Sequence, residues 1–448
     1  MLLIATVCSC RTSNSHIHST AVHKERSYNV VAYVAGWSTF PISSIKADEL
    51  TIINYAFANL DANGRIFFAN WNDKRNIDSL HSLKKINPNL KIIVSIGGWT
   101  WSTHFSDIAA DPNLRNKFAH NVADFVKQYN LDGIDIDWEY PGMKGAGNSF
   151  RPQDKENFTH LLRSTRSSLY SLELSQKRAE SYIITAATAT SANYLRNIEP
   201  QKIIEYLDFI HIMTYDYRSG DSWETGHHSN LWVSLSDWNN GNCIDKTINR
   251  YINAGIPPEK IIMGVPFYGR RWEGVTKKNN GLYQPAATAG LSISYRNIRN
   301  QCTNDKGYVS IWDDSAQAPY LWNQRDGIFI SYENEQSLRY KVDYIKQKNL
   351  NGIMFWEYTS DYNSELLNAI VRYLNTDRYA YKKQRDMLLE APYLVGIHPI
   401  IMNYFFSLEN EYGASPFDIP LVVFGLSDIS IKMFAPFMRS LWLSQFFV

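Results

Sequence analysis

The sequence predicts an α/β fold, a (β/α)8 TIM barrel with a small α+β insertion after the seventh strand. Three observations predict it: eight short β-rich runs recur through the first 376 residues, helix-like stretches lie between most of them, and one long interval interrupts the alternation. Alternating strands and helices are typical of parallel βα units, wound into a barrel or into a doubly wound sheet. The count of eight strands favours the barrel.

The predicted strands follow one another along most of the chain. They cover residues 29–37, 51–60, 91–99, 133–140, 181–190, 207–217, 260–269 and 351–358. Helices are expected at 113–130, before the fourth strand, at 155–176, after it, and at 243–255, before the seventh. Barrels of about 250 residues or more fold as one domain, so the length of this chain does not require several domains.

The alternation breaks at two places. Roughly sixty residues separate the seventh run from the eighth, far more than an ordinary βα loop, so we expect an inserted α+β subdomain at 272–328. The barrel itself is expected to span 28–376. The C-terminal tail, 377–448, is apolar and aromatic without βα alternation, and its apolar runs are too short for a membrane helix. We assign this tail no role.

Residues 1–27 resemble a weak secretory signal followed by a polar, Ser-rich linker. The apolar run is short and no basic residue precedes it. A bacterial lipoprotein signal, in which Cys10 would be acylated, is one interpretation. We therefore expect an extracellular or cell-surface protein, attached to a membrane only if Cys10 is lipidated. Cys243 and Cys302 are expected to be free buried thiols, although the sequence leaves a disulfide between them open.

Composition narrows the possible functions. The formal net charge of +1 gives no electrostatic argument for nucleic acid or an anionic membrane as a partner. Aromatic residues make up 14% of the chain, which fits either a large core or flat surfaces that stack on ring-shaped ligands. His227 and His228 lack a matching cluster at ligand spacing and are interpreted as a polar loop, so no metal or other cofactor is expected.

The fourth strand alternates apolar and acidic residues in the sequence LDGIDIDWEY, at 131–140. Asp135, Asp137 and Glu139 therefore share one face. On a sheet with one solvated face, these acids would be ordinary surface residues and would indicate no function. Inside a barrel they would replace branched apolar side chains, at a desolvation cost that needs a functional reason.

The other strands suggest that reason, because catalytic groups of a parallel barrel gather at the carboxyl ends of its strands. Most of the predicted strands end in polar or aromatic residues: Tyr33, Trp37, Tyr55, Ser95, Trp99, Tyr215, Asp216, Tyr268, Arg270 and Trp356. So many such residues at strand ends indicate a lined cleft, into which the acids of the fourth strand would point.

Five ordered motifs make a family resemblance specific. The DxxDxDxE pattern of Asp132, Asp135, Asp137 and Glu139 resembles the signature of family 18 glycoside hydrolases, the chitinase family. SIGGW at 95–99, MTYDY at 213–217, GVPFYGR at 264–270 and MFWEY at 354–358 resemble the other motifs of that family, in the same order. The resemblance covers about residues 28–376, which it implies to be a catalytic barrel, and the insertion is similar to the small α+β domain of one large chitinase branch.

The resemblance implies a retaining chitinase that hydrolyses β-1,4-linked N-acetylglucosamine polymers. Glu139 would be the general acid, and a nearby carboxylate would help it to hold its proton. The acetamido oxygen of the substrate would be the nucleophile, with Asp137 stabilising the developing charge and Tyr215 holding the acetamido group. Asp135 and Asp137 are expected to share a proton, and Ser95 to form a hydrogen bond with Asp135.

The remaining substrate contacts are also implied by the resemblance. They are Tyr33, Ser95, Gly98, Trp99, Tyr140, Met213, Asp216, Tyr268, Arg270 and Trp356, with Trp101 and Trp223 as further candidates for stacking on sugars. The partner would be chitin or an N-acetylglucosamine oligosaccharide, bound by a monomer. Two alternatives stay open: an endo-β-N-acetylglucosaminidase acting on N-glycans, and a non-catalytic chitin-binding lectin, which the presence of Glu139 and Asp137 disfavours.

Overall fold

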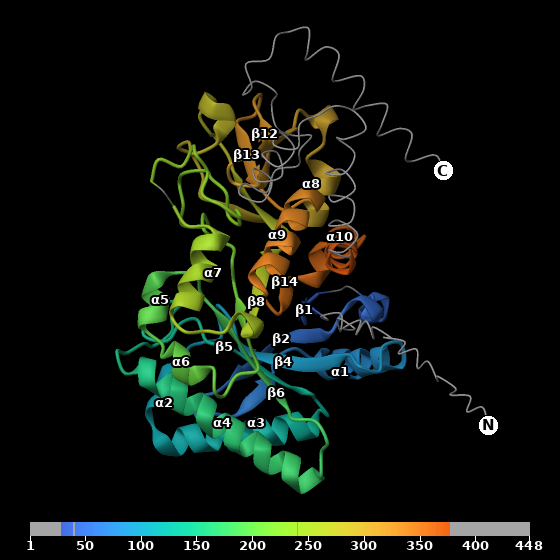
Figure 1. Cartoon of the computed structure of the whole chain (residues 1–448), viewed down its shortest axis with the longest axis vertical. Helices are drawn as coiled ribbons and strands as arrows, with labels where there is room; N and C mark the ends of the chain where they lie inside the picture. The colour runs from blue at the N-terminus through green and yellow to red at the C-terminus, as the bar shows by residue number, and fades with distance from the viewer. Residues whose placement is uncertain (1–27, 39–40, 240, 377–448) are drawn as a thin grey trace, which may run out of the picture.

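The computed structural model describes residues 28–38, 41–239 and 241–376 (Figure 1). The signal-like segment with Cys10 and the C-terminal tail lie outside the described residues, so the predictions for them remain predictions. Across the described ranges, no helix is both long and apolar enough to cross a bilayer. Cys243 and Cys302 are buried free thiols, as expected.

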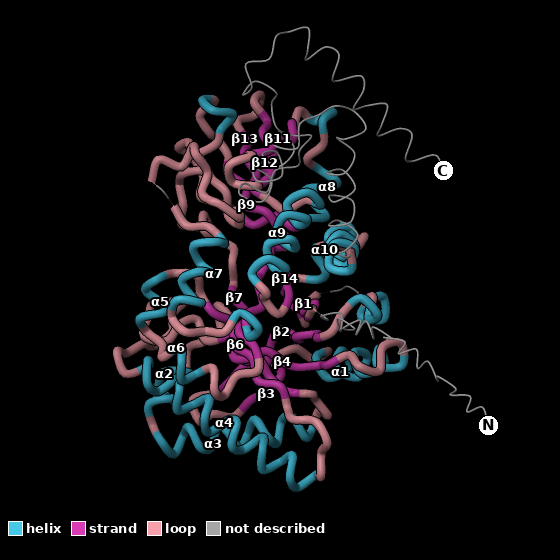
Figure 2. The backbone as a smooth tube through the Cα atoms, viewed as in Figure 1, coloured by secondary structure: helices cyan, strands magenta, loops and turns pink. Residues whose placement is uncertain are grey.

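Eight parallel strands close into a barrel, which confirms the predicted fold (Figure 2). They are β1 (Asn29–Ala35), β2 (Ile52–Leu60), β4 (Lys91–Gly97), β5 (Gly133–Asp137), β6 (Ile183–Thr188), β7 (Phe209–Ile212), β8 (Ile261–Pro266) and β14 (Gly352–Trp356). Neighbours follow the order β1-β14-β8-β7-β6-β5-β4-β2, and the pairing of β1 with β2 closes the ring. A short strand, β3 (Ile66–Phe68), pairs with β2 in the antiparallel direction.

Helices cover the outside of the barrel (Figure 1). The α-helices are α1 (Asp73–Ser82), α2 (Phe105–Ala110), α3 (Pro112–Gln128), α4 (Asp154–Gln176), α5 (Ala192–Arg196), α6 (Pro200–Ile203), α7 (Ile244–Asn253), α8 (Tyr295–Gln301), α9 (Glu335–Lys348) and α10 (Glu365–Asn375). Local sequence fixes several helix starts. The Asp111 carboxylate accepts two backbone N–H groups of the first turn of α3, and Pro112 follows it. Asn334 and Ser337 form a capping box at α9.

A second sheet of five antiparallel strands lies between β8 and β14 in the chain, in the upper part of Figure 1. Its strands are β9 (Tyr268–Trp272), β10 (Leu291–Ser294), β11 (Val309–Asp313), β12 (Ala318–Asn323) and β13 (Ile328–Ser331), in the order β10-β9-β13-β12-β11. Together with α8 they make an α+β unit.

One residue, Phe267, separates β8 of the barrel from β9 of the second sheet. Its ring is buried and stacks on Phe355 of β14, with centroids 4.1 Å apart. Its backbone N–H donates to the carbonyl oxygen of Trp356 at 2.7 Å, and its own carbonyl accepts from Tyr295 at 3.0 Å. The second sheet is therefore joined to the barrel without a flexible linker at this point.

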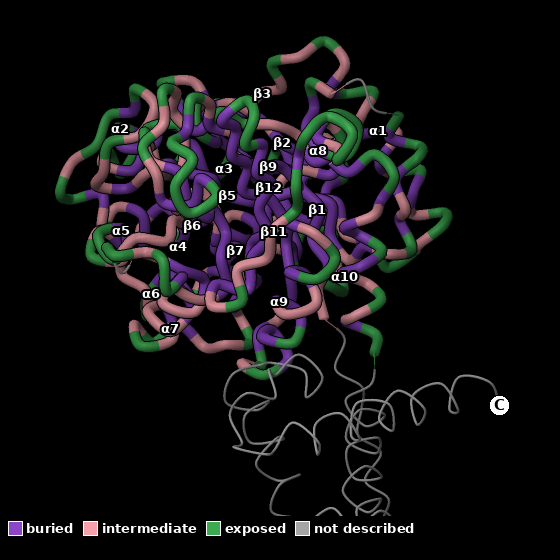
Figure 3. Tube along the Cα trace, turned by 90° about the horizontal axis from the view of Figure 1, so that it is seen from above, coloured by how far each residue is buried: buried purple, intermediate pink, exposed green. Residues whose placement is uncertain are grey.

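Buried residues concentrate along the barrel strands (Figure 3). A large apolar cluster includes strand and helix residues and fills the space between barrel and helices. A smaller cluster, which includes Tyr33 and Met354, lies on the inner face of the strands. Ile134 and Ile136 of β5 belong to the outer cluster, so the intervening Asp135 and Asp137 point into the barrel.

Candidate active site

Asp135 lies inside the barrel, surrounded by hydrogen-bond donors from four other strands. Its carboxylate accepts hydrogen bonds from the hydroxyls of Tyr33 (3.0 Å), Ser95 (2.7 Å) and Thr185 (2.6 Å). Nδ1 of His211 lies 3.5 Å from its Oδ1. Burial would raise the pKa of Asp135, but the contacts with His211, Thr185 and Ser95 outweigh burial and lower this pKa. Asp135 is therefore ionised.

Asp137, two residues further along β5, has the opposite environment. Its Oδ1 is buried and has no hydrogen-bond partner in the part of the chain that the structure describes. Burial, together with the charges of Glu139 and Asp135, raises the pKa of Asp137 well above its usual range. These opposite pKa shifts favour a proton on Asp137 or Glu139 over one on Asp135, because the donors around Asp135 stabilise its ionised form. The sharing of a proton between Asp135 and Asp137 stays a prediction.

Glu139 follows the end of β5, and its carboxyl group is buried. Burial raises the pKa of Glu139 to about 7; a hydrogen bond with Tyr140 opposes the rise, and the negative charge of Asp216 adds to it. The direction agrees with the expectation, but burial is the main cause, rather than a carboxylate on the same strand. Near neutral pH, Glu139 can therefore both hold a proton and release it.

The turn after β4 holds the backbone of both acids. Ser102 is buried; its hydroxyl accepts a hydrogen bond from the Glu139 N–H at 2.9 Å and lies 2.9 Å from the carbonyl oxygen of Gly98. The N–H of Gly98 donates to the carbonyl oxygen of Asp137 at 2.7 Å. Gly97 has a φ of +108°, and a Cβ there would collide with that same carbonyl oxygen. The glycine pair thus allows the close approach that fixes the acid-bearing strand end.

Asp216 and Arg270 face each other where β7 and β9 meet the site. The guanidinium donates two hydrogen bonds to the carboxylate, each 2.7 Å long. Nδ1 of His228 lies 3.6 Å from Asp216 on another side. His227 and His228 lie in a loop, as predicted, but both rings are fully buried and each faces a carboxylate.

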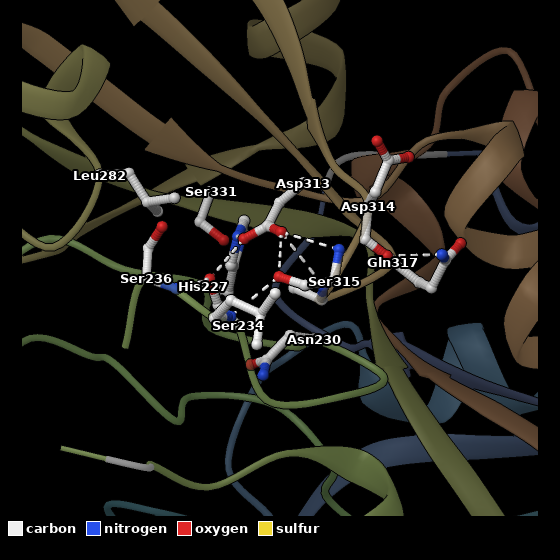
Figure 4. Close-up of polar contacts among 12 residues, drawn as sticks. His227, Asn230, Ser234, Ser236, Leu282, Asp313, Asp314, Ser315, Gln317 and Ser331 are labelled. Atoms are coloured by element: carbon white, nitrogen blue, oxygen red, sulfur yellow. Dashed lines mark hydrogen bonds and ion pairs between the residues drawn. The ribbon is translucent and has the colours of Figure 1, made fainter. Parts of the chain in front are cut away.

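His227 reaches in the other direction, toward the second sheet (Figure 4). Its Nε2 lies 3.1 Å from Oδ2 of Asp313, at the end of β11. Asp313 also accepts hydrogen bonds from the hydroxyls of Ser234 and Ser315, each 2.6 Å long. Burial would raise the pKa of Asp313, but His227 and the two serines outweigh it and lower this pKa. His228 thus contacts Asp216 within the segment after β7, and the adjacent His227 contacts the second sheet.

Trp356, at the end of β14, belongs to a group of aromatic rings beside the acids. Its ring stacks on Phe57 with centroids 5.5 Å apart, and Trp37 lies 6.2 Å away. Tyr33, which donates to Asp135, lies 5.8 Å from the same indole. This group places flat apolar surface next to the carboxyl end of β5.

Tyr215 and Tyr268 lie together on the other side of the site. Their rings are 6.1 Å apart and nearly perpendicular. Burial and the negative charges of Asp137 and Asp216 raise the pKa of Tyr215 well above its usual range, so its hydroxyl keeps its hydrogen. Met213 packs against the inner apolar cluster of the barrel.

The remaining aromatic candidates are more exposed. Trp99 is 53% exposed and lies 6.3 Å from the ring of Tyr140. Trp223 is 62% exposed, and its carbonyl accepts a hydrogen bond from Ala286. Trp101 lies 6.4 Å from Phe57. Trp99 and Trp223 thus present aromatic surface to solvent.

Two residues singled out from the sequence lie away from the site. Asp132 pairs with Lys84 at 2.5 Å and with Arg178 at 3.2 Å, just before the start of β5. Its role is structural, at the barrel end opposite the acids. Tyr55 points outward, because its hydroxyl donates to Asp73 of α1 at 2.6 Å.

Four polar residues of the site are missing from the sequence prediction: Thr185, His211, Ser102 and His228. Thr185 and His211 each stand between apolar residues inside a predicted strand, and this signal could have identified them, since a polar side chain inside a barrel needs a partner. Ser102 and His228 lie in loops and carry no such signal. In the described ranges, no group of three or more His, Cys, Asp or Glu residues is arranged to hold a metal ion.

Comparison with known proteins identifies the family. The profile of glycosyl hydrolases family 18 matches residues 29–361. The chain belongs to this family. The predicted enzyme class, a glycosidase, is thereby confirmed, together with the barrel.

Individual relatives of this family 18 chain include several named chitinases. Chitinase A1 of Niallia circulans is 35% identical over 409 residues, which cover 77% of the chain but only 58% of that protein. Chitinase B of Serratia marcescens is 31% identical over 411 residues, covering 76% of the chain and 80% of that protein. A solved family 18 N-acetylglucosaminidase from Paenibacillus barengoltzii is 37% identical, with a TM-score of 0.72, and covers 78% of the chain and 100% of its own.

Proposed function

We propose that this family 18 enzyme is a chitinase that hydrolyses β-1,4-linked N-acetylglucosamine polymers with retention, using the substrate's acetamido group as the nucleophile. The contrast between two carboxylates carries the proposal. The Asp135 carboxylate already accepts hydrogen bonds from three hydroxyl groups, whereas Oδ1 of Asp137 has no hydrogen-bond partner among the described residues. A buried acceptor without a donor is costly, and an acetamido N–H is a donor that would satisfy it.

The carboxylates near Glu139 argue against a protein nucleophile. A retaining glycosidase with its own nucleophile needs a second free carboxylate across the scissile bond from the acid. Asp135 accepts hydrogen bonds from three hydroxyl groups, and both carboxylate oxygens of Asp216 accept a hydrogen bond from Arg270. Asp137 precedes Glu139 on the same strand end rather than facing it. Substrate assistance resolves this, because the acetamido oxygen supplies the attacking group.

The proposed chemistry follows from the proton positions. When the Asp137 and Glu139 pair holds one proton, Glu139 donates it to the glycosidic oxygen as the bond to the anomeric carbon breaks. The acetamido oxygen attacks that carbon, and ionised Asp137 accepts the acetamido N–H and stabilises the positive oxazolinium. Glu139 then removes a proton from the water that opens the ring. Two inversions give net retention.

A second candidate is an enzyme that releases single N-acetylglucosamine units. The Paenibacillus protein named as an N-acetylglucosaminidase favours it, since the present chain covers that protein completely. An endo-β-N-acetylglucosaminidase on N-glycans remains a third candidate, and a lectin the non-enzymatic one. All three enzymes would use the same acid and the same acetamido mechanism, so substrate choice must separate them.

Product analysis separates these functions. The purified enzyme is incubated with chitin hexamer and, separately, with a high-mannose glycopeptide, and the products are resolved by chromatography, with Glu139→Gln as the inactive control. Dimers and trimers from the hexamer support the chitinase, monomers support the N-acetylglucosaminidase, and cleavage of the glycopeptide alone supports the N-glycan enzyme. Binding without any product supports the lectin. Proton NMR of the first product should show the β-anomer, and the α-anomer would contradict substrate assistance.

We further infer the setting of this activity. Residues 28–376 would be the catalytic barrel, with 272–328 as an inserted subdomain that carries part of the substrate surface. The enzyme would act outside the cell as a monomer. Light scattering of the purified chain tests the oligomeric state, and fractionation of the producing cells tests the location.

A further inference from the structure

His211 is a buried titratable residue next to the acids, and the chemistry above gives it no role. It lies on β7, and its side chain is fully buried. Nδ1 lies 3.0 Å from the hydroxyl of Tyr33 and 3.5 Å from Oδ1 of Asp135. Nε2 is buried, and no hydrogen-bond partner for it exists among the residues that the structure describes.

The hydrogen bonds determine which ring nitrogen carries the hydrogen. Tyr33 has one hydroxyl hydrogen, which it donates to Oδ2 of Asp135 at 3.0 Å. Its oxygen can then only accept from His211, so Nδ1 is the N–H. In the neutral ring, Nε2 is then a bare acceptor. A doubly protonated ring would bury a second N–H without an acceptor, which is more costly.

We propose that His211, as the neutral Nδ1–H tautomer, is a positioning residue of the reaction. Its N–H fixes the direction in which Tyr33 donates, and it keeps Asp135 ionised, so that the transferable protons remain on Asp137 and Glu139. This inference rests on the proposed function and deepens it. His211 acts through Tyr33 and Asp135 rather than on the sugar.

The groups around His211 are consistent with this single task. The titratable groups that face it are Tyr33 from β1 and Asp135 from β5. Its register partners on the flanking strands, Ala187 and Ile262, carry no charge. Asp137 and Tyr215 act on Tyr33 from beyond this shell.

Loss of the Nδ1–H donor should shift the pH dependence of the rate in one direction. Asp135 would lose one of the contacts that lower its pKa. Asp135 would then take up a proton at a higher pH than in the wild type, and the proposed active form, in which Asp135 is ionised, would be lost at that higher pH. The acid limb of the pH–rate profile should therefore move to higher pH.

Nitrogen-15 NMR of the histidine side chains tests the tautomer directly in the unsubstituted enzyme. The expected result is a neutral ring protonated at Nδ1, which the two ring nitrogens report through their separate chemical shifts. His211→Leu, in which the signals are lost, assigns them. A ring protonated at Nε2, or at both nitrogens at neutral pH, would overturn the proposal whatever the activity.

Matched variants test the function of the N–H. The amide of His211→Asn can replace the Nδ1–H, the amide of His211→Gln reaches only the Nε2 position, and His211→Leu offers no donor. We expect kcat of the Asn variant to stay within about threefold of wild type, and kcat of the Gln and Leu variants to fall about 10- to 100-fold, with KM changing less. Only the latter two should show the shifted acid limb. Thermal unfolding checks that all variants fold.

The outcomes separate this inference from the proposed function. Equal loss of kcat in the Asn and Leu variants, or an unshifted acid limb in the Leu variant, would overturn the role of His211. Inactivity of the unsubstituted enzyme toward chitin hexamer would instead overturn the proposed function, and the tautomer would still decide the hydrogen-bond arrangement around Asp135.

Discussion

Arg270 holds Asp216 with two parallel hydrogen bonds, each 2.7 Å long, and so connects the second sheet to the strand end that carries Tyr215. Burial would raise the pKa of Asp216, but His228 and Arg270 outweigh it and lower this pKa. Asp216 is thus a fixed negative charge. Because that charge contributes to the raised pKa of Glu139, it helps to set the pH range in which the acid holds its proton.

Substitution of Asp216 should move the alkaline limb of the pH–rate profile. Asp216→Asn removes the negative charge, so the pKa of Glu139 should fall and the alkaline limb of kcat/KM should move to lower pH by roughly half a unit to one unit. Arg270→Met leaves the charge uncompensated and should move the limb the other way. Steady-state rates on a soluble chitin oligomer across pH measure both shifts.

Arg271→Met is the matched control for Arg270, since Arg271 is the next residue and pairs with Glu273 instead. It should leave the alkaline limb in place. A limb that moves to higher pH in Asp216→Asn would contradict the electrostatic link between Asp216 and Glu139.

The acid itself should destabilise the folded protein at neutral pH. The pKa of Glu139 rises from 4.5 to about 7 on folding, so folding favours the protonated form. This carboxyl therefore costs no stability below pH 4.5, and its cost grows as pH rises to 7. Glu139→Gln removes that cost, which is at most about 3 kcal/mol. Thermal unfolding should show the variant more stable than wild type at pH 8 and nearly equal to it at pH 4.5.

Glu205→Gln provides the control for this stability prediction, because Glu205 is exposed. Its unfolding temperature should follow that of wild type at every pH. A Glu139→Gln variant that is less stable than wild type at pH 8 would show that the carboxyl makes favourable contacts that outweigh its burial.

The two acids should differ in their response to a good leaving group. Glu139→Gln cannot protonate the glycosidic oxygen, so its rate on chitin oligomers should fall by about 10² to 10⁴. An aryl glycoside with an acidic phenol needs little protonation and should restore much of that rate. Asp137→Asn should stay slow on both substrates, because the oxazolinium of the proposed mechanism would still lack its negative partner. Rescue of the Asp137 variant alone would reverse the two assignments.

The contact between His227 and Asp313 should stabilise the protein only above the range in which Asp313 titrates. The lowered pKa of Asp313 means that its stabilisation is fully present above the ordinary value of 3.8 and is lost as pH falls through the lowered value. Asp313→Asn should cost about 1–3 kcal/mol at pH 7 and progressively less below pH 3.8. Denaturant unfolding at several pH values measures this, with exposed Asp314→Asn as the control that should change little.

The sequence alone predicted the barrel, because the pattern of each strand is visible within its own short run of residues. Each of the eight barrel strands lies within one of the predicted runs, and the alternation in β5 already separated Asp135 from Ile134. Of the contacts across the barrel interior, the hydrogen bond of Ser95 with Asp135 was predicted and is confirmed, whereas those of Thr185 and His211 were not predicted. Which donor reaches Asp135 depends on how eight strands close, and this closure brings His211 and Tyr33 together although 178 positions separate them in the chain.

The errors have the same physical origin. Tyr55 was grouped with the residues at strand ends, but β2 turns it toward α1, and the β2–β4 register shifts between Ala56 and Ala58. The burial of His228 was not predicted, because nothing in its neighbourhood along the chain shows that Asp216 lies against it. The donors that lower the pKa of Asp135 also come from distant strands, and sequence proximity to Asp137 does not show them.

The single residue between β8 and β9 bears on how the proposed substrate would reach the acids. Phe267 is packed on Phe355, and its backbone N–H and carbonyl are both hydrogen-bonded, so this junction has no flexible linker on which the second sheet could swing open. A hinged lid must open and close within each turnover, commonly on the microsecond-to-millisecond scale. The packed junction at Phe267 imposes no such wait. If the enzyme is the proposed chitinase, sliding and release of the sugar chain are then the steps that would set the pause between successive cuts.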